Sequence, residues 1–413
     1  MRVTALLNRL LALPGVWVRG VSLTGEMAVV TVALRRRKLV CPLCGYVTSA
    51  RRDTRRVPSR WRHLDLGRWR VEVRATLRRL DCPVHGTHVE GVPFARYRSG
   101  FTRDVEDLIA FLATKMDKTA ITRLARIDWD TVGRICQRVV ADGLDPARLD
   151  GLVHIGVDEV SWKRQHNYLT LVADHSSGTI VWGTEGKDTA ALDEFFAELG
   201  AERAAALEAV SLDMGQAYAK STRTHAPKAV ICIDPFHAVQ LVTDALDTVR
   251  RAEWQQMRKL DKTAARKFKG ARWALLKRPE ALSDDQAGTL RKLRRRGGAV
   301  WRAYSLTEAF RAIFAGDLTI DEAEELINRW ISRASRSRLE PFTKAAKTIR
   351  EHRDGILAAL WLGINNGRAE GLNNVVRLIT RRAFGFHSAR AALALIQLTC
   401  GPIELVLPHE RSP

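Results

Sequence analysis

Long hydrophobic runs are missing from this sequence. No stretch of its 413 residues reaches the roughly 18 consecutive apolar residues that a membrane-spanning helix needs. The apolar segment 1–14 is interrupted by Asn8 and Arg9 and has no small-residue cleavage site after it. A short amphipathic helix is expected there, not a signal peptide. We therefore expect a cytoplasmic protein with no membrane partner.

Cysteine is also scarce. The six cysteines are Cys41, Cys44, Cys82, Cys136, Cys232 and Cys400. They do not form the evenly spaced framework that small secreted proteins use for disulfides, whereas three of them cluster at a spacing typical of metal ligands. This usage weighs against a disulfide scaffold and favours a reducing compartment.

Acidic residues are too few to balance the basic ones. The chain has 46 Asp and Glu against 67 Lys and Arg, which leaves a formal net charge of +21. Such an excess favours a polyanionic partner, with DNA as the main candidate. An anionic membrane surface is the competing partner, but no basic amphipathic helix stands apart from the domains. The length predicts two to three domains at ~150 residues each.

Two short motifs near the N-terminus have the spacing of zinc ligands. Cys41-Pro-Leu-Cys44-Gly45 and Cys82-Pro-Val-His85-Gly86 each hold two ligands separated by two residues, with glycine after the second. Two such knuckles complete a tetrahedral Zn²⁺ site of Cys41, Cys44, Cys82 and His85. His88 could replace His85 as the fourth ligand, and the alternative to a metal site is a pair of unrelated turns.

The segment between the knuckles is rich in arginine. Residues 51–79 hold 11 arginines and three acids. From Arg70 to Arg78 the sequence alternates with period two, which predicts a strand with Val71, Val73, Ala75 and Leu77 facing inward. Arg70, Arg74 and Arg78 then share the outer face, where they suit DNA phosphates. A solvated charged face is the alternative interpretation.

Residues 101–142 are predicted to be helical. A helix opening at Thr102-Arg-Asp-Val-Glu, a short helix over 118–125, a turn at 126–128 and a helix from Trp129 to Val140 match the helix-turn-helix pattern, with Asp128 as its N-cap. An ordinary small helical bundle would give a similar pattern.

An α/β region follows. Strands are expected over 154–164, 167–174 and 179–182, then a helix over 188–199, a strand ending at Asp213, a helix, and a strand ending at Asp234. The order β-β-β-α-β-α-β is the ribonuclease-H-like arrangement, in which the first and fourth strands are neighbours. Asp158 and Asp213 should therefore lie side by side.

Carboxylates in this arrangement suit phosphoryl transfer on nucleic acid. Two Mg²⁺ ions activate the attacking oxygen and stabilise the leaving one, and such hard cations prefer carboxylate oxygens. Asp158 would bridge the two ions, Asp213 would bind one and Glu370 the other. Asp234 is a lower-ranked candidate, and His237 either orients a ligand or is structural. Glu159 should point to the opposite face of its strand.

The C-terminal half is predicted to be mostly helical. Residues 245–345 break the α/β rhythm, and Arg250 to Arg302 hold 17 basic residues against five acids, so we expect a helical insertion that contacts DNA. In the helix after Gly367, Glu370, Arg377 and Arg381 fall on one polar face.

Together these motifs resemble the DDE transposases of bacterial insertion sequences, specifically the ISL3 family. The resemblance covers nearly the whole chain and rests on Trp61-Arg-His-Leu-Asp-Leu-Gly67, Gly156-Val-Asp-Glu159, Tyr168-Leu-Thr170, Leu212-Asp-Met214, Asp234-Pro-Phe-His237, Glu370-Gly-Leu-Asn373 and Arg381-Arg-Ala-Phe-Gly-Phe386. It implies recognition of terminal inverted repeats, Mg²⁺-dependent cleavage and strand transfer, and an acidic triad of Asp158, Asp213 and Glu370. The family commonly has Cys-x-x-Cys where this chain has Cys82-Pro-Val-His85.

The resemblance also implies an organisation and a setting. We expect an α/β multidomain protein that is nucleoid-associated in the cytoplasm and forms a homodimer or larger assembly on DNA. Its expected parts are a zinc ribbon (1–95), a helix-turn-helix (100–145), a ribonuclease-H-like core in two pieces (150–245 and 346–405) and a basic helical insertion (246–345).

Two other functions compete with an active transposase. An element-derived DNA-binding regulator would keep the DNA-reading modules and lack catalysis. A stand-alone ribonuclease-H-type nuclease would cleave without needing element ends.

Overall fold

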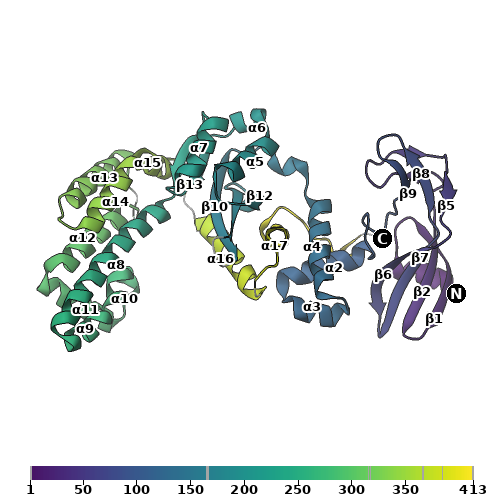
Figure 1. The fold of residues 1–413 in the computed structure, drawn as a ribbon, viewed down its shortest axis with the longest axis horizontal. Helices are drawn as coiled ribbons and strands as arrows, with labels where there is room; N and C mark the ends of the chain where they lie inside the picture. Colours follow the sequence, from purple (N-terminus) through teal and green to yellow (C-terminus); the bar gives the residue numbers. More distant parts are fainter. Residues whose placement is uncertain are drawn as a thin grey trace. The chain divides into compact units, whose positions relative to one another are not determined.

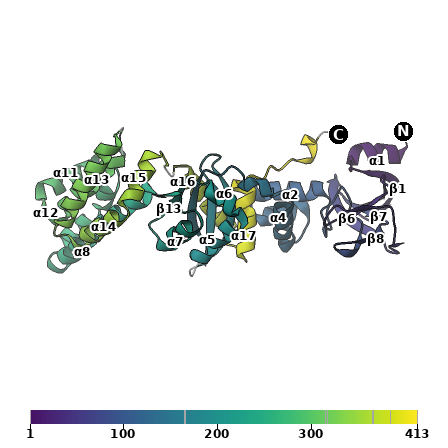
Figure 2. The ribbon, with the colours of Figure 1, turned by 90° about the horizontal axis from the view of Figure 1, so that it is seen from above.

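The computed structural model describes residues 2–163, 167–314, 316, 318–364, 367–383 and 385–411, except for the side chains of residues 367–370 and 373. The chain forms two compact units (Figures 1 and 2). The first consists of Met1–Arg148 with Val376–Pro413, and the second of Leu149–Val375. No helix in the described ranges is long and apolar enough to cross a membrane.

A four-stranded sheet forms the base of the first unit. Its order is β1-β2-β7-β6, and β2 pairs with β7 in parallel while the other pairs are antiparallel. Val71, Val73 and Ala75 are fully buried, as their alternation predicted. They pack in a core with Trp61 and Phe94, and removing these side chains from water stabilises the sheet. The elements are α1 (Val3–Leu11), β1 (Val16–Thr24), β2 (Met27–Leu34), β6 (Ser59–Leu66) and β7 (Trp69–Ala75).

The expected continuous strand through Arg78 is wrong. β7 ends at Ala75, and Arg78 begins β8 in a separate three-stranded sheet with the order β5-β8-β9. Its guanidinium binds the buried carboxylate of Glu90 at 2.6 Å and the carbonyl of Arg37 at 2.8 Å. Arg78 therefore does not share an outer face with Arg70 and Arg74. The short strands here are β3 (Leu39–Val40), β4 (Val47–Thr48), β5 (Asp53–Thr54), β8 (Arg78–Cys82) and β9 (Gly86–Val89).

The helices of the first unit match the expected helix-turn-helix. The short helix spans Lys118–Ala125 as predicted, and the turn reverses at Arg126, which adopts a left-handed conformation. Asp128 is the N-cap residue of the following helix, but its side chain makes no capping hydrogen bond. The elements are α2 (Arg103–Lys115), α3 (Lys118–Ala125), α4 (Trp129–Gly143), η1 (Pro146–Leu149), α17 (Ala389–Cys400) and η4 (Pro408–Glu410).

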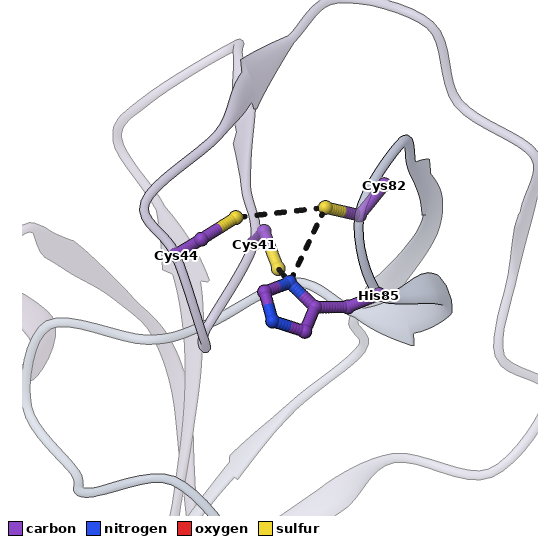
Figure 3. Close-up of side chains that lie close together, drawn as sticks. All are labelled: Cys41, Cys44, Cys82 and His85. Atoms are coloured by element: carbon purple, nitrogen blue, oxygen red, sulfur yellow. Dashed lines mark hydrogen bonds between the residues drawn. The ribbon is translucent and has the colours of Figure 1, made fainter.

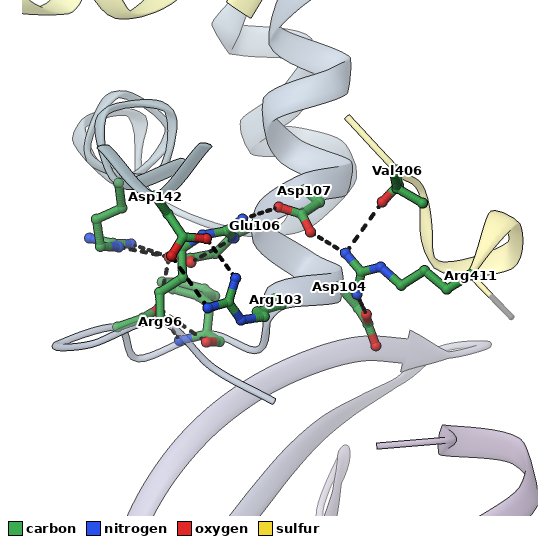
Figure 4. Close-up of polar contacts among 11 residues, drawn as sticks. Arg96, Arg103, Asp104, Glu106, Asp107, Asp142, Val406 and Arg411 are labelled. Carbon is green, nitrogen blue, oxygen red and sulfur yellow. Dashed lines mark hydrogen bonds and ion pairs between the residues drawn. The ribbon is translucent and has the colours of Figure 1, made fainter. Parts of the chain in front are cut away.

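Polar contacts fasten these helices to the sheet and to the end of the chain. The backbone of Arg62 in β6 forms hydrogen bonds with both Gly100 and Thr102. Asp65, further along β6, forms an ion pair with Arg126. Arg411, near the C-terminus, forms ion pairs with two acids of α2, Asp104 and Asp107 (Figure 4). The sheet, the helix-turn-helix and the C-terminal segment are thus tied together.

The contact between β6 and the start of α2 is expected to depend on pH, because it contains the buried side chain of His63. Its Nδ1 lies 2.9 Å from the Thr102 hydroxyl, and burial lowers the pKa of His63 to about 4. In the unfolded chain the His63 side chain binds a proton near pH 6.5, whereas in the folded protein His63 stays neutral until about pH 4. The stability that His63 contributes is therefore present above pH 6.5 and lost as pH falls towards 4, by about 3 kcal/mol in total.

We expect peptides covering 59–66 and 102–115 to lose hydrogen-exchange protection between pH 6.5 and 4, after correction for intrinsic exchange rates. His63→Gln should flatten this loss, while His409→Gln, at an exposed position, should not. Equal pH dependence in wild type and His63→Gln would contradict the prediction.

A five-stranded sheet forms the centre of the second unit. Its order is β12-β11-β10-β13-β14, and β13 lies parallel to both of its neighbours. The first and fourth strands of the region, β10 and β13, are neighbours as predicted. The elements are β10 (His154–Lys163), β11 (Asn167–Asp174), β12 (Thr179–Glu185), α5 (Thr189–Leu199), α6 (Ala201–Ala205), β13 (Ala209–Leu212), α7 (Gln216–His225) and β14 (Val230–Ile233).

Different helices cover the two faces of this sheet. Ile155 and Val157 of β10 pack in a core with Phe195 of α5 and Tyr218 of α7. On the other face, Ala209 and Cys232 pack with Ala359 of α15 and with Ile364. Because side chains alternate along a strand, the face of any β10 residue follows from its position relative to Val157.

Helices occupy most of the rest of the second unit and share one large core. Val242 of α8, Phe310 of α12 and Phe342 of α14 are all completely buried in it. The elements are α8 (Pro235–Leu260), α9 (Lys262–Lys269), α10 (Arg272–Leu276), η2 (Pro279–Ala281), α11 (Asp284–Arg296), α12 (Gly298–Arg311), η3 (Ala312–Phe314), α13 (Ile320–Ser335), α14 (Glu340–Glu351), α15 (Arg353–Trp361) and α16 (Gly367–Arg382), whose last residues belong to the first unit.

Candidate metal centre and carboxylate site

The two knuckles bring together the four zinc-ligand candidates (Figure 3). The ligand atoms of Cys41, Cys44, Cys82 and His85 all lie within 4.8 Å of one another. The sulfurs of Cys44 and Cys82 are 3.5 Å apart, and Nδ1 of His85 lies 3.7 Å from Sγ of Cys82. A tetrahedral Zn²⁺ with Zn–S bonds of about 2.3 Å would separate its ligands by roughly 3.5 to 3.8 Å. The four residues therefore fit such an ion.

Local hydrogen bonds prepare the second knuckle for a cation. Burial alone would raise the pKa of the Cys82 thiol, but the backbone and imidazole of His85 and the backbone of Val84 lower it to about 6. A thiolate is the form that binds metal. Nε2 of His88 lies 2.9 Å from the carbonyl oxygen of His85, which gives His88 a supporting position. The geometry selects His85 as the fourth ligand.

The three candidate aspartates lie on or directly after neighbouring strands of the α/β sheet. The pairing of β10 with β13 runs from His154 and Ala209 to Gly156 and Ser211, so Asp158 and Asp213 each follow the last paired residue by two positions. Leu212 pairs with Ile233, which sets Asp234 level with Asp213. The parallel strands β13 and β14 both end at this level, where their carboxyl ends meet.

Strand parity places Asp158 and Glu159 on opposite faces. Glu159 shares its face with Val157 and pairs with Thr170, whose hydroxyl lies 2.8 Å from that of Tyr218 on α7. Asp158 therefore lies on the face that α15 covers. Its carboxylate accepts a 2.7 Å hydrogen bond from the backbone N–H of Glu159.

The acids of this edge influence one another electrostatically. Burial raises the pKa of Glu159, Lys187 opposes that rise, and the negative charges of Asp213 and Asp158 add to it. Carboxylates that repel one another are stabilised when a cation binds between them. Among the side chains that the structure describes, these acids do not form a set of three within ligand distance of one another.

Asp213 is held by a tight turn that sequence reasoning missed. Its Oδ1 accepts a 2.8 Å hydrogen bond from the backbone N–H of Gly215. A Cβ at position 215 would lie only 2.7 Å from that oxygen, although the backbone there has an ordinary negative φ of −76°. Gly215 thus leaves room for the carboxylate. The Leu212-Asp-Met-Gly215 sequence carries a signal for this, because an Asp two residues before Gly is typical of such turns.

Asp234 has a structural role in the helix that follows it. It is 3% exposed, and its carboxylate caps α8 by accepting a 2.9 Å hydrogen bond from the N–H of Phe236. Nε2 of His237 lies 3.6 Å from the same carboxylate. N-cap hydrogen bonds stabilise a helix by about 1 kcal/mol, so these contacts explain a buried acid at this position without a metal.

The remaining candidates lie on α16 and on β7. The backbone of Glu370 is in α16, but its side chain lies outside the described part of the chain. Arg377 and Arg381 are exposed on the same helix. In the first unit Arg70 is exposed, while Arg74 is partly exposed and forms an ion pair with Glu72.

Comparisons with known proteins are extensive. A family model described as "Transposase" (DDE_Tnp_ISL3) matches residues 155–396, and a model described as "Helix-turn-helix domain of transposase family ISL3" matches residues 90–140. The chain belongs to the ISL3 transposase family. It is 40% identical to the transposase for insertion sequence element IS1557 of Mycobacterium tuberculosis, over 93% of this chain and 91% of the relative.

A more distant relative extends the comparison. The chain is 25% identical to the transposase for insertion sequence element IS1001 of Bordetella parapertussis, over 84% of this chain and 85% of the relative. The two family models together cover the helix-turn-helix and the α/β sheet of this transposase-family member. The helix-turn-helix interpretation is therefore confirmed over that of an ordinary bundle.

Proposed function

We propose that this ISL3-family protein is an active DDE transposase. It binds the terminal inverted repeats of its insertion sequence and catalyses metal-dependent strand cleavage and strand transfer. The observation that carries the proposal is the parallel pairing of β10 and β13, because the same register continued by two residues would bring Asp158 beside Asp213. The strand order agrees with the one expected for a ribonuclease-H-like core, and residues 246–345 would be the helical insertion of that core.

The proposed catalytic residues are Asp158, Asp213 and Glu370. Two bound Mg²⁺ ions would supply activation of the attacking oxygen and stabilisation of the leaving oxygen. Asp158 would hold both ions, Asp213 one and Glu370 the other. Ile364 packs on the same face of the sheet as Ala209 and Cys232, and it precedes Glu370 by only six residues. This placement supports Glu370 as the third acid. Asp234 ranks below Asp213 because it already caps α8.

DNA recognition is proposed for the first unit and for the polar face of α16. The zinc centre would hold the knuckles in place, and the helix-turn-helix would read the end of the element. Arg70 and Arg74 on β7, and Arg377 and Arg381 on α16, are proposed phosphate contacts. Arg78 is not, because its guanidinium binds the fully buried carboxylate of Glu90, whereas Arg74 pairs with the partly exposed Glu72 of its own strand. A homodimer or larger assembly on DNA, associated with the nucleoid in the cytoplasm, completes the proposal.

A strand-cleavage assay tests this function. A labelled duplex carrying the element's own end is incubated with the protein and Mg²⁺, and an unrelated duplex is the control. Mg²⁺-dependent cleavage confined to the end supports the transposase. Tight end binding without cleavage at any Mg²⁺ concentration would favour a regulator, and equal cleavage of both duplexes would favour a general nuclease.

Gly215→Ala is expected to lower the cleavage rate without unfolding the protein. A methyl group 2.7 Å from Oδ1 of Asp213 forces that carboxylate out of position, while a φ of −76° suits alanine. A misplaced catalytic group can cost about a hundredfold in rate. Single-turnover cleavage should therefore fall about a hundredfold, with end affinity and thermal melting close to wild type.

Gly20→Ala in β1 provides the control, because a Cβ at that position meets no atom of the described residues within 4 Å. This variant should cleave like the wild type. Unchanged cleavage in Gly215→Ala would mean that the position of Asp213 does not matter to the reaction.

A further inference from the structure

A large groove opens in the first unit between the zinc knuckles, β6 and the start of α2. Its volume is about 840 Å³, and Cys41 and Gly45 of the first knuckle contribute to its wall. Six arginines line it, against two acids. The arginines are Arg36, Arg55, Arg60, Arg96, Arg98 and Arg103, and the acids are Glu90 and Asp142.

Both acids of the groove are already neutralised. Asp142 accepts hydrogen bonds from Arg96 at 2.9 Å and Arg103 at 2.6 Å (Figure 4). Glu90 is bound by Arg78, which lies outside the groove lining. These contacts leave the groove with an excess of positive charge.

Three other guanidiniums of the groove form no ion pair in the part of the chain that the structure describes. They belong to Arg55, Arg60 and Arg98, which are exposed. The guanidinium of Arg55 donates a hydrogen bond to the Ser59 hydroxyl, at 3.0 Å. Burial, together with the charge of Arg78, lowers the pKa of Arg36, and the charge of Glu90 opposes this. A groove with several unbalanced guanidiniums attracts a polyanion.

Backbone hydrogen bonds hold the walls of the groove together. The N–H of Gly91 donates to the carbonyl of Val40 at 3.0 Å, which joins one wall to the first knuckle. The N–H of Arg62 donates to the carbonyl of Gly100 at 2.8 Å, which joins β6 to the loop before α2. The groove is therefore preorganised, and binding does not have to order its walls.

The loop that carries Arg98 is held in a costly conformation. Arg98 has a φ of +58°, in the left-handed region that non-glycine residues rarely adopt. The neighbouring Ser99 hydroxyl donates to the buried Glu106 carboxylate at 2.7 Å and keeps the loop in place. Such strain concentrates at binding sites, and here it places a guanidinium at the groove.

We propose that this groove binds the phosphodiester backbone of double-stranded DNA through Arg55, Arg60 and Arg98. The inference rests on the proposed end binding and extends its contact surface from β7 into the groove, since Arg60 pairs in register with Arg74 of β7. DNA is favoured over an acidic protein or RNA because the groove borders α2 of a helix-turn-helix in a transposase-family chain. Exposed guanidiniums without carboxylate partners suit phosphates, and phosphate contacts fix the position of a protein on DNA without reading its sequence.

The test is the salt dependence of DNA binding by the full chain. Each phosphate contact contributes about 0.9 to the slope of log K against log[salt]. The Arg60→Ala/Arg98→Ala variant should therefore have a slope shallower than wild type by about 2. Its affinities for the element's end and for an unrelated duplex should fall by the same factor, and fluorescence anisotropy measures both.

Arg9→Ala/Arg19→Ala is the matched control. It removes the same charge from exposed positions on α1 and β1, outside the groove, and should leave the slope within a few tenths of wild type. Arg60→Lys/Arg98→Lys should recover the slope, and this recovery separates a lost phosphate contact from misfolding.

Three results would overturn the groove assignment. They are a wild-type slope in Arg60→Ala/Arg98→Ala, an equal change in the control, and single-stranded RNA competing better than duplex DNA. Failure of the proposed function looks different. A protein that binds its end but never cleaves would still show the change in slope, whereas normal cleavage with an unchanged slope would reject the groove alone.

Discussion

Asp158→Ala should abolish end cleavage and strand transfer while leaving end binding intact. The carboxylate is expected to hold both Mg²⁺ ions, and metal ions contribute several kcal/mol of transition-state stabilisation. The cleavage rate should therefore fall at least about a thousandfold. Asp213→Ala and Glu370→Ala are expected to behave in the same way, each through the loss of one ion.

The same assay separates catalytic from structural acids. Asp234→Asn keeps an N-cap acceptor for α8 and should retain cleavage, whereas Asp234→Ala should mainly lower the melting temperature. Asp285→Ala, at an exposed position in α11, is the control for loss of an acidic side chain. Loss of cleavage in Asp234→Asn, with full activity in Asp213→Ala, would transfer the second metal ligand to the end of β14.

Removing zinc from the four-ligand site should weaken DNA binding strongly. Structural zinc sites contribute roughly 10–16 kcal/mol to the folding of small domains. The knuckles have few other contacts, since their buried core contains only Leu39, Cys41, Leu80 and Cys82. Chelation or Cys41→Ser should therefore unfold the ribbon and weaken end binding, while the second unit keeps its melting transition.

The fourth ligand gives this prediction an internal control. His85→Ala should lower both zinc content, measured by metal analysis, and end affinity. His88→Ala should retain zinc, because His88 contacts only the backbone of His85 among the hydrogen bonds described. Full end affinity in a protein shown to be free of zinc would contradict a role for the metal in DNA binding.

Short-range patterns predicted the local structure well. The two-residue spacing within each knuckle and the helical bounds of 118–125 agree with the structure. The knuckle spacing and the helix depend on residues that are close together in the sequence, where backbone geometry and side-chain periodicity determine the local structure directly. The adjacency of β10 and β13 was also predicted, because right-handed crossovers leave few ways to order such a sheet.

The candidate site was only partly predictable, because some of its contacts depend on more than local sequence patterns. That β10, which carries Asp158, pairs with β13, which directly precedes Asp213, follows from the strand order. The close approach of Gly215 to Asp213 does not, because it depends on the turn that the chain adopts after β13. Strand patterns fix faces and levels, but they leave the contacts of each side chain open.

The sequence by itself determined the family, the metal-ligand spacing, the helix-turn-helix and the order of the strands. Only the tertiary structure decided what individual charges do. Arg78 and Arg74 look equivalent in an alternating pattern, yet Arg78 binds Glu90 across 12 residues of chain. Arg60 and Arg98 meet at one groove although 38 positions separate them. A charge is neutralised or left available by whichever segments fold against it, and local periodicity carries no information about those distant partners.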